Sequence, residues 1–81
     1  MNKQISARGK NSSPDLDAIG RVVREARHRH GMTQAELAGL SGTSQRFISQ
    51  LESGVRNVTL SKVLDVLAVL GLRLQAVEAG Q

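Results

Sequence analysis

The feature that most constrains the fold is a repeated set of helix start and stop signals between residues 14 and 71. Side chains that cap helix N-termini precede four stretches with apolar residues at helical spacing, and these caps are Ser13, Thr33, Ser44 and Thr59. A glycine that can end a helix follows three of the four stretches, at Gly31, Gly54 and Gly71. Because these local signals agree along the chain, we predict an all-α domain of four to five helices over residues 14–71.

The second and third predicted helices fit a helix-turn-helix, which is two short helices joined by a tight turn. A capping box from Thr33 to Glu36 starts the second helix. Ala38 is small enough for the third helix to cross over it, and Gly42 supplies the turn. Ile48 and Leu51 are spaced to anchor the third helix on the second.

The N-terminal segment differs from this helical middle. Residues 1–13 are polar and aperiodic, and they carry Lys3, Arg8 and Lys10 without an acidic residue. The formal net charge is +4, although residues 15–81 carry eight basic residues against all seven acidic ones. We therefore expect residues 1–13 to be a flexible basic arm that suits an anionic polymer such as nucleic acid or only keeps the chain soluble.

The C-terminal segment has the period of a β-strand, because residues 72–77 alternate apolar with polar side chains. A single strand cannot satisfy its own backbone groups, so the same strand of a second chain is the expected partner; the alternative is a frayed tail. Val66 and Val69 add apolar surface to the fourth helix beyond the needs of one small core. We predict a homodimer with a dimerisation strand over residues 72–78, and its contact residues are Val66, Val69, Leu72, Leu74 and Ala76.

Several functional classes have no support in the sequence. The chain has no cysteine, and His28 and His30 point about 200° apart on a helix, so we expect no metal site. No residue set pairs a nucleophile with a base, and we therefore predict no enzyme activity and no cofactor. No apolar run approaches the ~20 residues that cross a bilayer, and residues 1–13 lack the apolar segment of a secretory signal. A cytoplasmic protein without a membrane partner is the expectation.

Residues 19–72 resemble the Cro/C1-type (XRE) helix-turn-helix domain of phage and bacterial repressors. The resemblance lies in three motifs, which are Gly31–Ala38, Gly42–Gln45 and Ile48–Gly54. It implies a lambda-repressor-like fold that binds DNA. Within this family, the alternating tail is similar to that of HipB-like antitoxins. That second resemblance implies dimerisation through the tail, repression of the protein's own toxin–antitoxin operon and binding of a HipA-like kinase toxin.

The third predicted helix carries the candidate base-reading residues. If this helix lies in the major groove, side chains near its N-terminus face the base edges. The amide of Gln45 can bond adenine N6 and N7 together, and Arg46 can read guanine or reach a phosphate. Ser49 and Gln50 lie one turn further along, and Ser44 caps the helix and can also reach DNA. The alternative for each of these residues is a solvated helix face.

Phosphate contacts are expected on either side of that helix. Gln34 begins the second helix, whose unpaired N–H groups favour an anion. In the repressors that the chain resembles, this glutamine touches the DNA backbone. Arg56 and Asn57, in the loop after the third helix, are further phosphate candidates.

Three other residues near the third helix are assigned to structure. The resemblance implies that Arg27 and Glu52 form a partly buried ion pair between the first and third helices. Phe47 could meet a thymine methyl or pack against the loop around Val55, and we favour packing.

The sequence thus predicts a DNA-binding transcriptional repressor that binds a pseudo-palindromic operator as a dimer, and the resemblance to HipB-like proteins implies that it serves as the antitoxin of a kinase toxin. A stand-alone phage-like repressor is the alternative. A module that binds only proteins would not need the polar side chains of Gln45, Arg46, Ser49 and Gln50 on its third helix.

Overall fold

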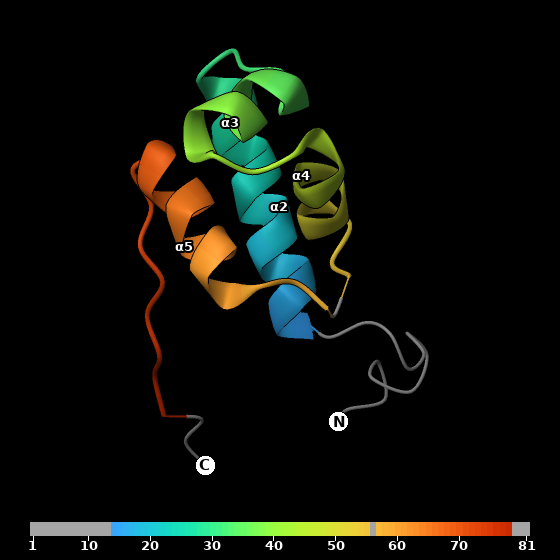
Figure 1. The fold of residues 1–81 in the computed structure, drawn as a ribbon. Coiled ribbons are helices and arrows are strands. Elements are labelled where there is room, and N and C mark those ends of the chain that lie inside the picture. The colour runs from blue at the N-terminus through green and yellow to red at the C-terminus, as the bar shows by residue number, and fades with distance from the viewer. Residues whose placement is uncertain (1–13, 56, 79–81) are drawn as a thin grey trace.

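The computed structural model describes residues 14–55 and 57–78. In that part of the chain four helices follow one another: α2 spans Pro14–Arg29, α3 Gln34–Ser41, α4 Gln45–Glu52 and α5 Leu60–Val69 (Figure 1). The predicted all-α architecture is confirmed. α3, α4 and α5 follow the predicted caps Thr33, Ser44 and Thr59, but Thr59 makes no side-chain capping hydrogen bond. The basic arm predicted over residues 1–13 lies outside the described residues.

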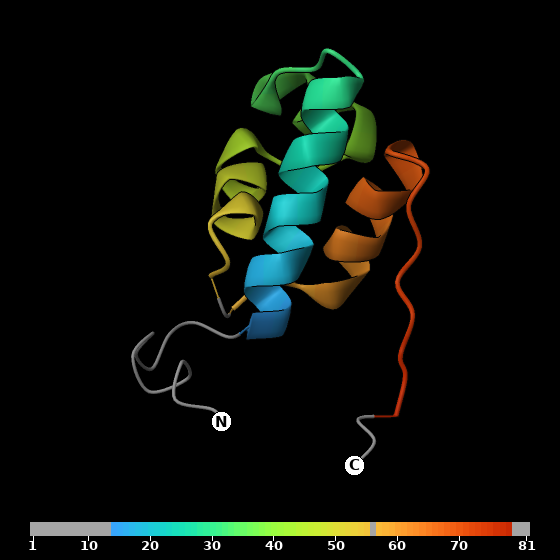
Figure 2. The same cartoon turned by 180° about the vertical axis from the view of Figure 1, so that it is seen from behind.

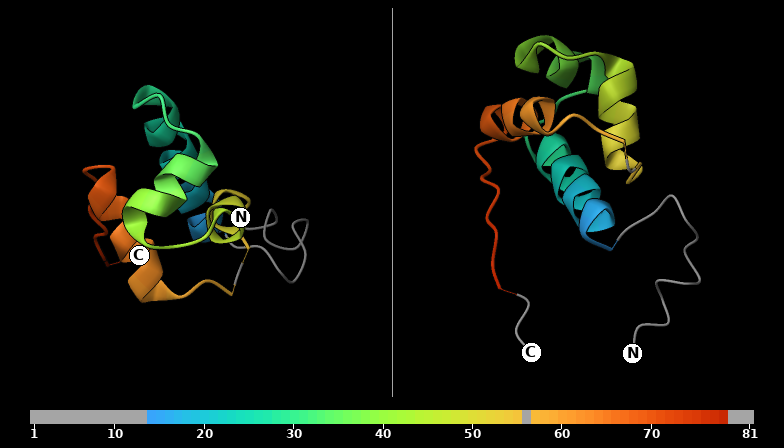
Figure 3. Two further views of the ribbon diagram at one scale, coloured as in Figure 1. Left: turned by 45° about the horizontal axis from the view of Figure 1, so that its top comes forward. Right: turned by 60° about the horizontal axis from the view of Figure 1, so that its bottom comes forward.

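The longest helix, α2, lies between two of the others. α4 lies on one flank of α2 and α5 on the other (Figures 1 and 2). α3 lies near the C-terminal end of α2 and packs against both α4 and α5 (Figure 3). This arrangement holds α4 from two sides and leaves a third side of that helix open to solvent.

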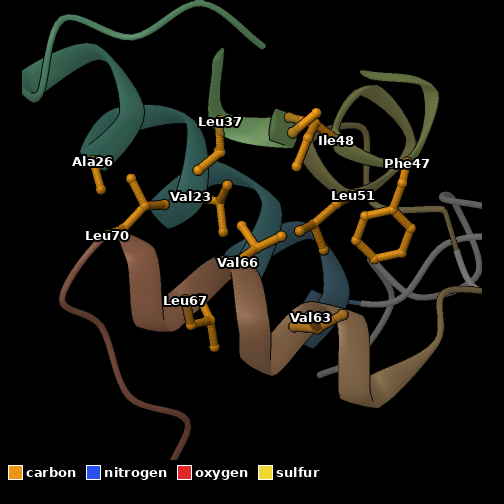
Figure 4. Close-up of a cluster of buried hydrophobic side chains, with 11 residues drawn as sticks. Val23, Ala26, Leu37, Phe47, Ile48, Leu51, Val63, Val66, Leu67 and Leu70 are labelled. Atoms are coloured by element: carbon orange, nitrogen blue, oxygen red, sulfur yellow. The ribbon is translucent and has the colours of Figure 1, made fainter. Parts of the chain in front are cut away.

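The core fills the space between the helices, and side chains from all four meet there (Figure 4). The buried apolar residues of the described chain are Val23, Ala26, Leu37, Ala38, Phe47, Ile48, Leu51, Val63, Val66, Leu67 and Leu70. Fully burying one side chain of the size of Leu37 or Ile48 stabilises a fold by about 1.5–3 kcal/mol. The predicted anchors Ile48 and Leu51 are 0% and 1% exposed, so the core fixes α4 firmly.

The C-terminal segment is extended, but residues 72–78 form no β-strand in the described chain. The segment runs down beside α5, on the side of the molecule away from α4 (Figures 1 and 2). An alternating pattern of apolar and polar residues favours a β-strand. A strand forms, however, only when its backbone hydrogen-bonds with the N–H and C=O groups of a neighbouring strand. The structure of one chain therefore does not support the predicted strand. Leu74 and Ala76 are exposed.

One predicted dimer contact is wrong. Val66 is 0% exposed and lies inside the core of its own chain, so it cannot contact another. Val69 and Leu72 are half-buried and pack against the same core. The large apolar residues that α5 exposes are Leu60 and Leu64, at 60% and 44%. Apolar residues surround most of α5, and its sequence alone therefore does not reveal which of them face inward.

A buried ion pair joins α2 to the end of α4. Arg27 Nε donates to Glu52 Oε2 at 2.6 Å and Arg27 Nη2 donates to Glu52 Oε1 at 2.9 Å. Arg27 Nη1 also donates to the carbonyl oxygen of Met32, at 2.9 Å. The pair that the resemblance implies is thus present, in the two-pronged geometry that arginine and a carboxylate favour.

The ion pair shifts the pKa values of the Arg27 and Glu52 side chains. The hydrogen bond to Glu52 raises the pKa of Arg27 above its ordinary value. Burial by itself would raise the pKa of Glu52, but hydrogen bonds from Arg27 and Gln34 outweigh burial and hold this pKa below its ordinary value. Both side chains are therefore charged at neutral pH.

The backbones of α2 and α4 also touch. A Cβ atom at Gly20 would lie 2.5 Å from the carbonyl oxygen of Leu51 and 2.8 Å from that of Glu52. Alanine stabilises a helix more than glycine does, so helix propensity does not explain a glycine here. The close approach of α2 and α4 explains why residue 20 is a glycine.

We predict that Gly20→Ala lowers the free energy of unfolding by about 1–3 kcal/mol, because the added methyl would force α4 away from α2. Gly39→Ala is the matched control: Gly39 also lies inside a helix, but its Cβ would meet nothing within 4 Å. The control should gain about 0.5–1 kcal/mol from helix propensity. Urea denaturation measures both variants. A Gly20→Ala protein as stable as the wild type would show that the backbone contact does not set the spacing.

We also predict that Glu52→Gln costs about 3 kcal/mol of stability at neutral pH, because the charge of Arg27 would stay buried without a counterion. The wild-type chain should lose this contribution in acid. The pKa of Glu52 is lower in the folded than in the unfolded chain, so the stabilisation is complete above the ordinary value of 4.5 and disappears as the pH falls through the folded pKa.

The control for this pH dependence is Glu25→Gln, which removes an equal charge from an exposed position of α2. Denaturant titrations between neutral and acid pH should show a flatter stability profile for Glu52→Gln than for Glu25→Gln. Identical profiles would mean that the Arg27–Glu52 pair contributes nothing to acid sensitivity.

Candidate nucleic-acid interface

The first helix of the candidate interface, α3, begins at a complete capping box. Thr33 Oγ1 accepts a hydrogen bond from the N–H of Glu36 at 3.0 Å, and Glu36 Oε1 accepts one from the N–H of Thr33 at 2.8 Å. These reciprocal bonds are the ones that the sequence predicts. They fix the direction in which α3 starts, and with it the position of Gln34.

The turn between α3 and α4 is held by its glycine and by two hydroxyl groups. Gly42 has a φ of +71°, a left-handed conformation that side-chain-bearing residues rarely adopt, and its N–H bonds to the carbonyl oxygen of Ala38. Buried Ser41 donates to the carbonyl oxygen of Leu37 at 2.8 Å, and its Oγ lies 2.9 Å from Thr43 Oγ1. The role of Gly42 was predicted from the sequence, whereas the roles of Ser41 and Thr43 were not.

The candidate recognition helix, α4, divides cleanly into two sides. Ser44 Oγ accepts from the N–H of Phe47 at 3.0 Å and so caps the helix as predicted. Phe47 is 8% exposed and belongs to the core, which confirms the predicted packing. On the other side Gln45, Arg46 and Ser49 are exposed. One solvent-facing surface therefore offers an amide, a guanidinium and a hydroxyl group within little more than one helical turn.

The remaining predicted contact residues have different surroundings. Gln50 is half-buried, at the border of the exposed side of α4. Gln34 is also half-buried, and its Nε2 donates to Glu52 Oε1 at 3.1 Å, which joins it to the ion pair. Asn57 is exposed in the loop after α4. Arg56 lies outside the described residues.

A cation on α5 lies beside α4 and was not anticipated from the sequence. The ammonium nitrogen of Lys62 is 5.8 Å from the centroid of the Phe47 ring, within the range of a cation–π contact. The two residues are 15 positions apart and belong to different helices, so no local spacing signals their contact. Lys62 itself is exposed.

Residues 14–55 and 57–78 contain no group of three or more His, Cys, Asp or Glu side chains that could hold a metal ion. None of the helices in those ranges combines the length and apolar character needed to span a bilayer.

Comparison with known proteins gives one consistent result. Residues 23–77 match the family model described as "Helix-turn-helix". The chain is 40% identical over 63 residues to the uncharacterized HTH-type transcriptional regulator y4mF of Sinorhizobium fredii, and the match covers 78% of this chain and 83% of y4mF.

Two solved structures are similar over most of their length. The restriction-modification controller protein C.AhdI from Aeromonas hydrophila matches with a TM-score of 0.65 and 36% identity, over 73% of this chain and 86% of C.AhdI. A chain of the HipA-HipB-O2-O3 complex matches with a TM-score of 0.71 and 28% identity, over 89% of this chain and 99% of that one. The chain belongs to the helix-turn-helix family of DNA-binding transcriptional regulators, in its Cro/C1 (XRE) branch and close to HipB-like members.

Proposed function

We propose that this regulator is a repressor that reads a pseudo-palindromic operator in duplex DNA with two copies of α4. The observation that carries the proposal is the division of α4 into a buried side fixed by Ile48 and Leu51 and an exposed side with Gln45, Arg46 and Ser49. A rigid helix with hydrogen-bonding side chains on its free side is what direct reading of base edges requires.

We assign base contacts to the exposed side of α4. Gln45 bonds an adenine through its amide, and Arg46 bonds a guanine or a neighbouring phosphate. Ser49 lies one turn after Gln45 on the same side, and Gln50 lies one turn after Arg46 at the border of that side. Ser44 already accepts the capping bond, and its hydroxyl hydrogen remains available for the DNA backbone.

We assign phosphate contacts to residues that flank α4. One N–H of the Gln34 amide is used by Glu52, which leaves the second N–H and the backbone N–H at the start of α3 for a phosphate. The bond to Glu52 also orients this amide, so less side-chain entropy is lost on binding. Asn57, with Arg56 beside it in sequence, would contact the backbone from the loop after α4.

We propose a homodimer on the side of the molecule away from α4. A groove of about 190 Å³ between α2, α5 and the tail is lined mainly by apolar side chains, namely those of Ala18, Ile19, Val22, Leu67, Leu72, Arg73 and Leu74. Val22 and Leu74 line this groove and are 44% and 45% exposed, and contiguous exposed apolar side chains mark sites of protein–protein contact. A second copy would cover them and would pair residues 72–78, including Ala76, as the missing strand. Val69, which is half-buried on α5, is the remaining candidate contact on that helix.

The proposed partner beyond DNA is a HipA-like kinase toxin, which makes the chain an antitoxin that also represses its own operon. Its support is the likeness, over nearly the whole matched chain, to a chain of the HipA-HipB-O2-O3 complex. The likeness to a restriction-modification controller protein favours the second candidate, a regulator without a toxin. Copurification from the native host distinguishes the two candidates, because only an antitoxin should copurify with a kinase-like protein.

Gln45→Ala tests the register of α4. We predict that the substitution costs about 1–3 kcal/mol at one base pair and relaxes the preference there, because one bidentate contact is lost. Gln34→Ala is the control with the same change of residue type, and it should weaken binding equally for all duplexes. Selection of bound DNA from a random pool measures both. If Gln45→Ala kept the wild-type ranking of sequences, the proposed register would be wrong.

Removal of the residues after Gly71 tests the dimer. The shortened chain should sediment as a monomer at concentrations where the full chain is dimeric, because it lacks Leu72, Leu74 and the strand. Circular dichroism of the shortened chain should retain the helical signal, since the four described helices end before residue 72. A shortened chain that dimerises as well as the full one would exclude the tail as the main contact.

A further inference from the structure

Arg27 and Lys62 both lie beside α4, and their charges are held in different ways. Arg27 forms its ion pair with Glu52, so its charge is compensated within the protein. Lys62 reaches from α5 over the ring of Phe47. The difference matters for an anionic ligand, because only an uncompensated charge attracts it strongly.

The charge of Lys62 is not cancelled by a neighbour. Lys62 forms no ion pair with another residue that the structure describes, and Asp65, three positions along α5, does not reach it. The face of an aromatic ring attracts an ammonium group through its quadrupole, which carries no net charge. The contact with Phe47 therefore restrains the ammonium group and leaves its full positive charge in place.

Lys62 also lies next to the candidate DNA-reading side. Phe47 and Gln50 are three positions apart on α4, so they are neighbours on the helix surface, and half-buried Gln50 marks the border of the exposed side. The ring of Phe47 points from α4 toward the end of the core where α5 begins (Figure 4). A lysine that rests on this ring stands at the edge of α4, where the DNA backbone beside an occupied major groove would run.

We propose that Lys62 binds a phosphate of the DNA backbone on the α5 side of α4, with the Phe47 ring as the support that holds its ammonium group ready. This proposal rests on the proposed function, because it needs α4 in the major groove. In this proposal the buried ring of Phe47 both packs in the core and positions the ammonium group of Lys62. The contact is independent of base sequence, and therefore it contributes affinity and not specificity.

The test compares Lys62→Gln with Arg21→Gln, which removes an equal charge from an exposed position of α2. The probes are the preferred duplex from the selection described above and a scrambled duplex of equal length. For Lys62→Gln we expect the slope of log affinity against log salt to become shallower by about 0.9 for both duplexes. Between about 50 and 200 mM salt, the wild-type affinity should then fall about 3.5 times further than that of the variant. Arg21→Gln should keep the wild-type slope, and so should Lys62→Arg.

Each other outcome has a distinct meaning. If Lys62→Gln lowers thermal stability but keeps the wild-type salt slope, the contact with Phe47 is purely structural and the proposal fails. If Lys62→Gln and Arg21→Gln shift the slope equally, the effect is one of net charge, and the proposal fails as well. If the wild-type chain prefers no duplex in the selection, the proposed function itself has failed, whatever the variants do.

Discussion

The buried pair of Arg27 and Glu52 is the interaction on which the rest of the structure depends. It lies where α2, the start of α3 and the end of α4 come together, and Gln34 joins it through its amide. A charge in this place is unfavourable without its partner, so all three helices must be in position at once for either group to be buried. The pair therefore links the folding of the domain to the placement of the candidate recognition helix.

The two faces of α4 have different roles. Ile48 and Leu51 face the core and fix the helix, whereas Gln45, Arg46 and Ser49 face solvent and are free to bind. A helix that is already fixed loses little backbone entropy on binding, which favours a small domain with a limited interface.

Much of this could be predicted from the sequence, because caps, turn glycines and apolar spacing act over short distances. The Thr33 capping box, the Gly42 turn and the burial of Ile48 followed from such local signals. Contacts between residues far apart in the sequence could not be predicted in this way. Lys62 and Phe47 meet only because α4 and α5 pack together, and Val66 could not be told from its exposed neighbours on an almost wholly apolar helix. The Arg27–Glu52 ion pair is also such a long-range contact, and it was predicted only because the resemblance to the family implied it.

The missing side chain at Gly20 has a consequence for control of the protein. Carbonyl groups of α4 rest directly on the backbone of α2, without a flexible side chain that could act as a spacer. α2 and α4 should therefore move as a rigid body, and an effector has little scope to tilt one recognition helix within its domain. In the proposed dimer, a signal would instead act on the distance between the two domains, which must match half-sites about one turn of the double helix apart. Allosteric control would then reside in the tail and the groove beside it.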